Sequence, residues 1–103
     1  WALGMQSKLP FPDAICDVPE AARLMIAMPA REMIEAATLR PTVEILDTLD
    51  HNYRLMWAAR DSAERQAEPP AGIEGGVITE RQHTFNWLTY FENAEWDDVD
   101  IPS

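Results

Sequence analysis

A helical period of apolar residues runs through the middle of the chain, from Pro41 to Gln66. At about 100° per residue, polar side chains gather on one side of a helix over this range and apolar ones on the other. The apolar face consists of Ile45, Leu46, Leu49, Tyr53, Met56 and Trp57. Pro41 suits a first helical position, because its missing N–H would have no intrahelical partner there. The pattern predicts one long amphipathic helix.

A second helix is predicted from Val77 to Phe91. Its apolar face comprises Val77, Thr84, Phe85, Leu88 and Phe91. The connecting segment, Gln66 to Gly76, contains two prolines and three glycines and is therefore predicted to be a loop. A loop of this kind between two long helices favours antiparallel neighbours.

Shorter elements are predicted before the long helix. The segment from Trp1 to Ser7 is interpreted as the last turns of a helix that ends at the following prolines. Asp17 and Glu20 form a capping-box pattern, which predicts a helix that ends near Pro29. A further short helix is predicted from Ala30 to Ala37.

These elements predict an all-α fold, a compact helical bundle with two long antiparallel helices and two or three shorter helices that cross them. Residues 1–103 form a single helical domain in this interpretation. Because the chain begins with Trp1 in the middle of an apparent helix, we expect it to be the C-terminal portion of a longer chain.

The charge of the chain narrows the choice of partners. Eighteen acidic residues face eight basic ones, for a formal net charge of −10. Nucleic acid is not an expected partner, because phosphate binding needs clustered Lys and Arg. No segment is apolar enough to suggest a membrane span. The expected partners are a basic protein or a second copy of the chain. A single cysteine, Cys16, fits a reducing cytoplasm.

Two arginines interrupt the apolar faces of the long helices. Arg60 falls at the centre of the first face and Arg81 at the centre of the second. A charge removed from water needs a partner, and the nearest acids are Glu80, Asp97 and Asp98. We expect Trp96 to fold the acidic end of the chain back so that its aspartates meet the arginines as a latch. Two alternatives are that the guanidinium groups reach solvent, or that they bind an anionic ligand.

A polar and aromatic edge is a second candidate site, for a ligand or a partner. Its members are Arg54, Trp57, His83, Asn86, Trp87 and Trp96. An alternative metal site combines Asp47, His51, Glu80 and His83, because Glu-x-x-His is a spacing found in helical carboxylate metal sites. His83 is also the one plausible general base. A single copy of the motif is weak support, so no catalytic residue, metal or cofactor is expected.

Three stretches of the chain together resemble a known bacterial family. They are AATLRPTVEILDTLDHNYRLMWAARDSA (Ala36 to Ala63), PPAGIEGGVITERQHTFNWL (Pro69 to Leu88) and WDDV (Trp96 to Val99). The family is the domain of unknown function numbered forty-two seventy-two. Its histidine position corresponds to either Gln82 or His83. Its members usually have more chain before the first stretch. The resemblance implies a mostly helical bacterial domain and no particular reaction.

The resulting functional hypothesis is a non-catalytic, acidic, cytoplasmic module for protein interaction or regulation. Its support is the net charge together with the lack of an assembled catalytic motif. The alternative is a small metal-dependent or general-base enzyme centred on Glu80 and His83. A cleft that brought both side chains together with a second acid would favour the enzyme.

Overall fold

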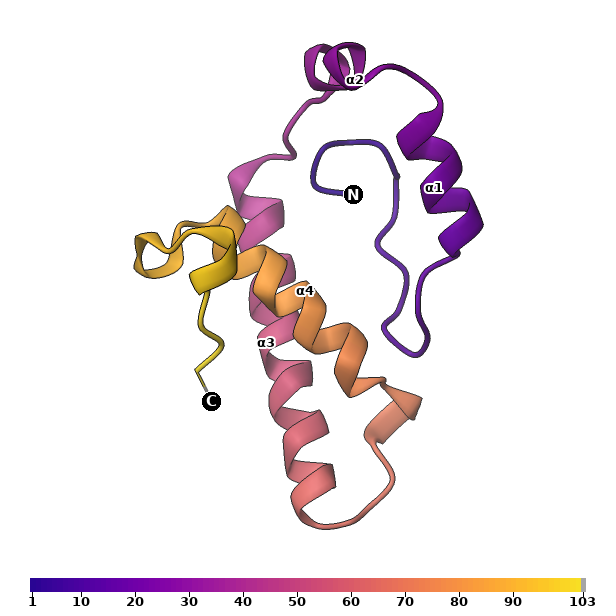
Figure 1. Ribbon diagram of the computed structural model, residues 1–103. Helices are drawn as coiled ribbons and strands as arrows, with labels where there is room; N and C mark the ends of the chain where they lie inside the picture. The colour runs from indigo at the N-terminus through magenta and orange to yellow at the C-terminus, as the bar shows by residue number, and fades with distance from the viewer. Residues whose placement is uncertain (103) are drawn as a thin grey trace.

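The computed structural model describes residues 1–102 and contains helices and turns, with no strand in that range (Figure 1). Four α-helices follow one another: α1 (Val18–Ile26), α2 (Ala30–Ala36), α3 (Thr42–Glu64) and α4 (Gly75–Leu88). Three short 3₁₀ turns complete the chain: η1 (Pro70–Gly72), η2 (Phe91–Asn93) and η3 (Trp96–Asp98). The all-α prediction is therefore confirmed.

The core lies between α3 and α4. The chain reverses after α3, so α4 runs back across it in roughly the opposite direction (Figure 1). Met56 of α3 and Ile78 of α4 are 1% and 0% exposed, and Ile73 from the connecting loop is 3% exposed. Ile101, near the end of the chain, packs against the same cluster. The fold is thus centred on one helix pair that the C-terminal segment helps to cover.

The buried faces of the long helices differ from the predicted apolar faces. In α3 the buried residues are Ile45, Asn52, Met56 and Ser62, and in α4 they are Ile78, Gln82, Phe85 and Asn86. Relative to the predicted apolar faces, both helices are rotated by roughly a sixth to a third of a turn. Leu46, Tyr53 and Trp57 consequently remain 47%, 37% and 46% exposed. The predicted faces were right at Ile45, Met56 and Phe85. They were wrong in their centre, because amide side chains, which the pattern counted as polar, are buried at the interface.

The first seven residues form turns, not the end of a helix. The side chain of Arg40 explains this correction, because it binds the carbonyl groups that a helix would use. Its Nε donates to the carbonyl oxygen of Trp1 (2.8 Å), and its Nη2 donates to that of Gln6 (2.7 Å). Gly4 adopts a φ of 77°, a left-handed conformation that suits a tight turn. The segment is held as an open loop beside α3.

The helices α1 and α2 stand apart from the α3–α4 pair (Figure 1). The start of α1 follows the prediction, since Asp17 accepts a hydrogen bond from the backbone N–H of Glu20 (3.1 Å). Neither helix has a buried residue. The expected crossing of short helices over the long ones is therefore not formed. The radius of gyration, 15.0 Å, exceeds the roughly 13 Å of a compact domain of this length.

Candidate functional site

A row of amide side chains joins α3, α4 and the end of the chain. Asn52 Nδ2 donates to Gln82 Oε1 (2.9 Å) and to the carbonyl oxygen of Ile78 (3.0 Å). Gln82 Nε2 donates in turn to Asn86 Oδ1 (3.0 Å), and Asn86 Nδ2 donates to the carbonyl oxygen of Asp100 (3.0 Å). All three amides are at most 6% exposed. We call Asn52, Gln82 and Asn86 the amide ladder; a buried polar network of this kind fixes how its elements are aligned.

Trp96 does fold back, and it lies on α4. Its ring centroid is 4.5 Å from that of His83 and 5.4 Å from that of Trp87, in edge-to-face arrangements. His83 Nε2 also donates a hydrogen bond to the carbonyl oxygen of Trp96 (2.9 Å). The expected folding back of Trp96 is thus confirmed. His83 anchors the C-terminal segment in this arrangement.

The arginines do not form the expected latch. Within residues 1–102, no ion pair joins Arg60 or Arg81 to Glu80, Asp97 or Asp98. The rotation of the long helices places both guanidinium groups beside the helix interface, where each is half-buried. Arg60 Nη1 is buried without a hydrogen-bond partner among the described residues. Burial lowers the pKa of Arg81 from its ordinary value.

The remaining predicted residues lie in separate places. Arg54 pairs with Asp50 on the surface (3.1 Å), and Trp57 packs edge-on against Tyr53 at 6.4 Å. The predicted edge thus divides, because of its described members only His83 and Trp87 contact Trp96. The alternative metal set of Asp47, His51, Glu80 and His83 is not brought together. Residues 1–102 contain no group of three or more His, Cys, Asp and Glu side chains placed to hold a metal ion.

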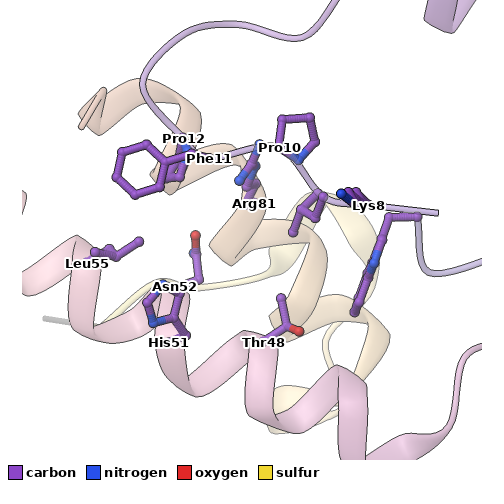
Figure 2. A pocket seen from close by; sticks show the side chains of 11 residues that line it. Lys8, Pro10, Phe11, Pro12, Thr48, His51, Asn52, Leu55 and Arg81 are labelled. Atoms are coloured by element: carbon purple, nitrogen blue, oxygen red, sulfur yellow. The ribbon is translucent and has the colours of Figure 1, made fainter. Parts of the chain in front are cut away.

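The structure forms a cavity of about 450 Å³ between the N-terminal segment and the long helices (Figure 2). One side is made by α3 and the other by the segment 8–12, with Arg81 entering from α4 between them (Figure 2). Its lining consists of Trp1, Lys8, Leu9, Pro10, Phe11, Pro12, Thr48, His51, Asn52, Leu55 and Arg81. We call this space the N-terminal cavity. Its volume falls within the range of small-molecule sites.

Both ends of the segment that covers the cavity are anchored. At one end, Arg40 binds the carbonyl groups of Gln6 and Ser7 (2.7 and 3.1 Å). At the other end, the backbone N–H of Glu74 donates to the carbonyl oxygen of Pro12 (2.7 Å). Because the segment between these anchors is extended and proline-rich, it forms a fixed wall. Hydrogen bonds at both ends of the segment therefore hold this wall of the cavity in place.

The cavity concentrates basic side chains in an acidic protein. Lys8, His51 and Arg81 line it, and no carboxylate does. Four of the eight Lys and Arg residues form ion pairs: Arg23, Arg40, Arg54 and Arg65. Lys8 and Arg81 belong to the other four, which have no ion-pair partner within residues 1–102. The half-buried Arg81 and the exposed Lys8 thus line the same cavity without a paired acid among the described residues.

The sequence interpretation missed several of these residues. Lys8, Arg40 and Asn52 were not expected to matter, and Gln82 was considered only for its place in the family pattern. The positions of Gln82 and Asn86, four apart on one helix, were a usable signal, as was an amide beside the apolar face of the long helix. For Lys8 and Arg40 there was no local signal, because their contacts join segments far apart in the chain.

A second candidate surface is the arm made by α1 and α2, residues 14–39. Its large apolar side chains are exposed to an unusual degree, including Ile26 (81%), Ile34 (75%) and Met25 (63%). Ile15 and Val18 extend this surface at 75% and 55% exposure. Exposed apolar side chains gathered on one part of a chain mark candidate contact sites in soluble proteins. We call it the apolar arm.

The protein is thus a small all-α domain that has a basic cavity and an uncovered apolar arm. No described helix combines the length and the apolar character that crossing a membrane requires. The chain belongs to the family described as Domain of unknown function (DUF4272), whose model matches residues 1–99. The match extends well beyond the three stretches that carried the resemblance. No curated protein and no solved structure is significantly similar to the chain.

Proposed function

We propose that the chain is a non-catalytic protein-interaction module that associates through the apolar arm, with a second copy as its partner. The observation that carries the proposal is the uncovered apolar surface of α1 and α2. The chain exposes 7490 Å² in total. A compact monomer of 11.7 kDa is expected to expose about 5,900 Å². The excess is about 1,600 Å² per chain.

The size of this excess supports a second copy. If two chains each covered about 1,600 Å², the interface would bury roughly 3,200 Å², within the range of obligate homodimers. Such interfaces are also more apolar than transient ones, which agrees with the isoleucines and methionines of the arm.

The distribution of charge supports the same partner over a basic one. Residues 14–39 contain four acids and two bases, whereas the whole chain carries a net charge of −10. The arm therefore carries a net charge of only −2, against −8 for the rest of the chain, so two arms repel one another weakly. A basic partner would be attracted mainly to the remaining residues, because they carry most of the negative charge. Repulsion between the other acidic surfaces should weaken as salt screens it.

Further observations support the non-catalytic part of the proposal and its location. His83, the residue considered as a general base, donates to the Trp96 carbonyl and packs against the Trp96 ring. Glu80 and His83 are not joined by a further acid within residues 1–102. The single thiol of Cys16 is exposed, which suits a reducing compartment such as the cytoplasm.

Light scattering coupled to size-exclusion chromatography tests the proposal over a range of concentrations and salt. We expect a dimer that salt strengthens, and a monomer for the double variant Ile26→Glu/Ile34→Glu. The matched control is Val43→Glu/Leu46→Glu, which adds the same charge at exposed apolar positions of α3 (64% and 47%) and should stay dimeric. A monomeric wild type would overturn the proposal. A dimer that only the α3 variant disrupts would overturn the assignment to the arm.

A further inference from the structure

We infer that the N-terminal cavity binds a small organic anion, a carboxylate or phosphate group carried on an apolar body. The inference is independent of the proposed self-association, because the cavity and the apolar arm share no residue. It rests on the charges at the cavity, on their lack of acidic partners and on the shape of the apolar wall.

The position of Arg81 provides the first argument. Its guanidinium enters the cavity from α4 (Figure 2) and is half-buried without an ion pair among residues 1–102. A partly desolvated charge without a counter-ion is unfavourable, so an entering anion would gain a strong partner. The planar guanidinium can donate two parallel hydrogen bonds to a carboxylate or a phosphate.

The composition of the cavity lining also favours an anionic ligand. Lys8 adds a second cation from the opposite wall, and His51 adds a ring that can donate a hydrogen bond. An acidic ligand thus meets only neutral or positive groups, although the chain as a whole carries −10. None of the 18 acids of the chain belongs to the 11 residues of this lining, which include both Lys8 and Arg81.

The apolar wall determines what kind of anion fits. The rings and aliphatic side chains that line the cavity are Trp1, Leu9, Pro10, Phe11, Pro12 and Leu55. An inorganic ion would leave this surface wet, whereas an organic body would bury it. The side-chain oxygen of Asn52 points away from α3 toward the side where Arg81 lies (Figure 2), and as an acceptor it does not bind the anionic group itself. Its amide nitrogen is held by Gln82 Oε1 and the Ile78 carbonyl oxygen, so the amide ladder fixes this orientation.

Binding can be tested with phenyl phosphate and phenylacetate, followed by NMR chemical shifts and calorimetry on the whole chain. We expect at least one anion to bind with a Kd of about 1 mM or tighter and to shift the amides of residues 8–11 and 48–55. Benzyl alcohol and inorganic phosphate, which lack the charge and the apolar body respectively, should bind at least about tenfold more weakly.

Variants that each remove one positive charge test whether the anion binds in the N-terminal cavity. Arg81→Gln should weaken binding about tenfold or more, because a charged hydrogen bond is lost. Arg60→Gln is the matched control, a half-buried arginine that also lacks an ion pair but lies outside the cavity, and it should leave affinity unchanged. Lys8→Gln, at an exposed position, keeps the test decisive if Arg81→Gln does not fold.

Several results would overturn the inference. One is the absence of binding by either organic anion up to about 10 mM. Another is an equal loss of affinity in Arg60→Gln and Arg81→Gln, which would mean unspecific attraction. A third is equal binding of benzyl alcohol or inorganic phosphate, which would remove the need for a charged organic ligand.

Discussion

The α3–α4 pair and the apolar arm show opposite relations between pattern and packing. In the arm, α1 separates apolar from polar residues well, yet neither α1 nor α2 buries a residue. In the pair, the buried faces include Asn52, Gln82 and Asn86, which a hydrophobic pattern assigns to solvent. An amphipathic pattern therefore identifies a helix face that can be buried. Whether that face is buried depends on the surface that packs against it.

Hydrogen bonding explains why the less apolar faces are the buried ones. An amide in the interior is costly unless its donors and acceptor are used. The ladder uses the side-chain nitrogens of all three amides, and the Asp100 carbonyl accepts from the last one. This network fixes how α3 and α4 are aligned, and the apolar contact at Met56 and Ile78 adds to the stability of the pair. The arm contains no comparable network.

The largest difference between the two regions is expected when an isoleucine is replaced by alanine in each of them. Ile78→Ala, at a 0% exposed position, should lower the free energy of unfolding by about 3 kcal/mol, because it leaves a cavity in the core. Ile26→Ala, at an 81% exposed position, should change it by less than about 0.5 kcal/mol when measured on the monomer. Urea unfolding followed by tryptophan fluorescence measures both. Equal losses would contradict the division into two regions.

The ladder is the next target. Asn52→Leu should cost about 2 kcal/mol in urea unfolding, because it leaves the Gln82 side-chain oxygen buried without its donor. Asp47→Leu, at an exposed position of the same helix, is the control and should have little effect. In the double variant Asn52→Leu/Gln82→Met the loss should be smaller than the sum of the two single losses, because the Gln82 oxygen is no longer left without a donor, although Asn86 Oδ1 then loses its own. A double variant that simply adds the two losses would argue against a coupled network.

A smaller effect is expected at the C-terminal segment. Trp96→Ala should lower stability by about 1–2 kcal/mol, because it removes edge-to-face contacts with His83 and Trp87. Asp97→Asn/Asp98→Asn should leave the Tm unchanged, since neither carboxylate forms an ion pair within residues 1–102. Thermal unfolding of the two variants distinguishes aromatic anchoring from the arginine latch. A large loss in the aspartate variant would restore the latch.

The smallest effect concerns the exposed surface of the arm. Hydrogen bonding to Arg23 lowers the pKa of Glu20 from its ordinary value. The ion pair therefore contributes to stability above that ordinary value, and the contribution is lost as the pH falls through the lowered one. In Arg23→Gln the pKa of Glu20 should rise toward its ordinary value. A titration of the Glu20 side-chain carbon signal by NMR measures it, and an unchanged pKa would contradict the pairing.

Local patterns were sufficient for the helices themselves. The long helix was predicted from Pro41 to Gln66 and lies at Thr42–Glu64, because a period of apolar residues and a proline at its start act within the segment. The capped start of α1 followed for the same reason, since Asp17 and Glu20 are only three residues apart. The fold class, the reversal after α3 and the return of Trp96 were also accessible from the sequence.

Only the tertiary structure decided which faces are buried and where the charges meet. Arg40 binds carbonyl groups more than 30 residues before it, and Lys8 shares a cavity with Arg81 although more than 70 positions separate them. No periodicity connects such positions. The two helix interiors also depended on Asn52 finding Gln82, a match between donors and acceptors that hydrophobicity does not encode. Local order was therefore determined by neighbouring residues, whereas the burial of each face and the N-terminal cavity were determined by contacts across the chain.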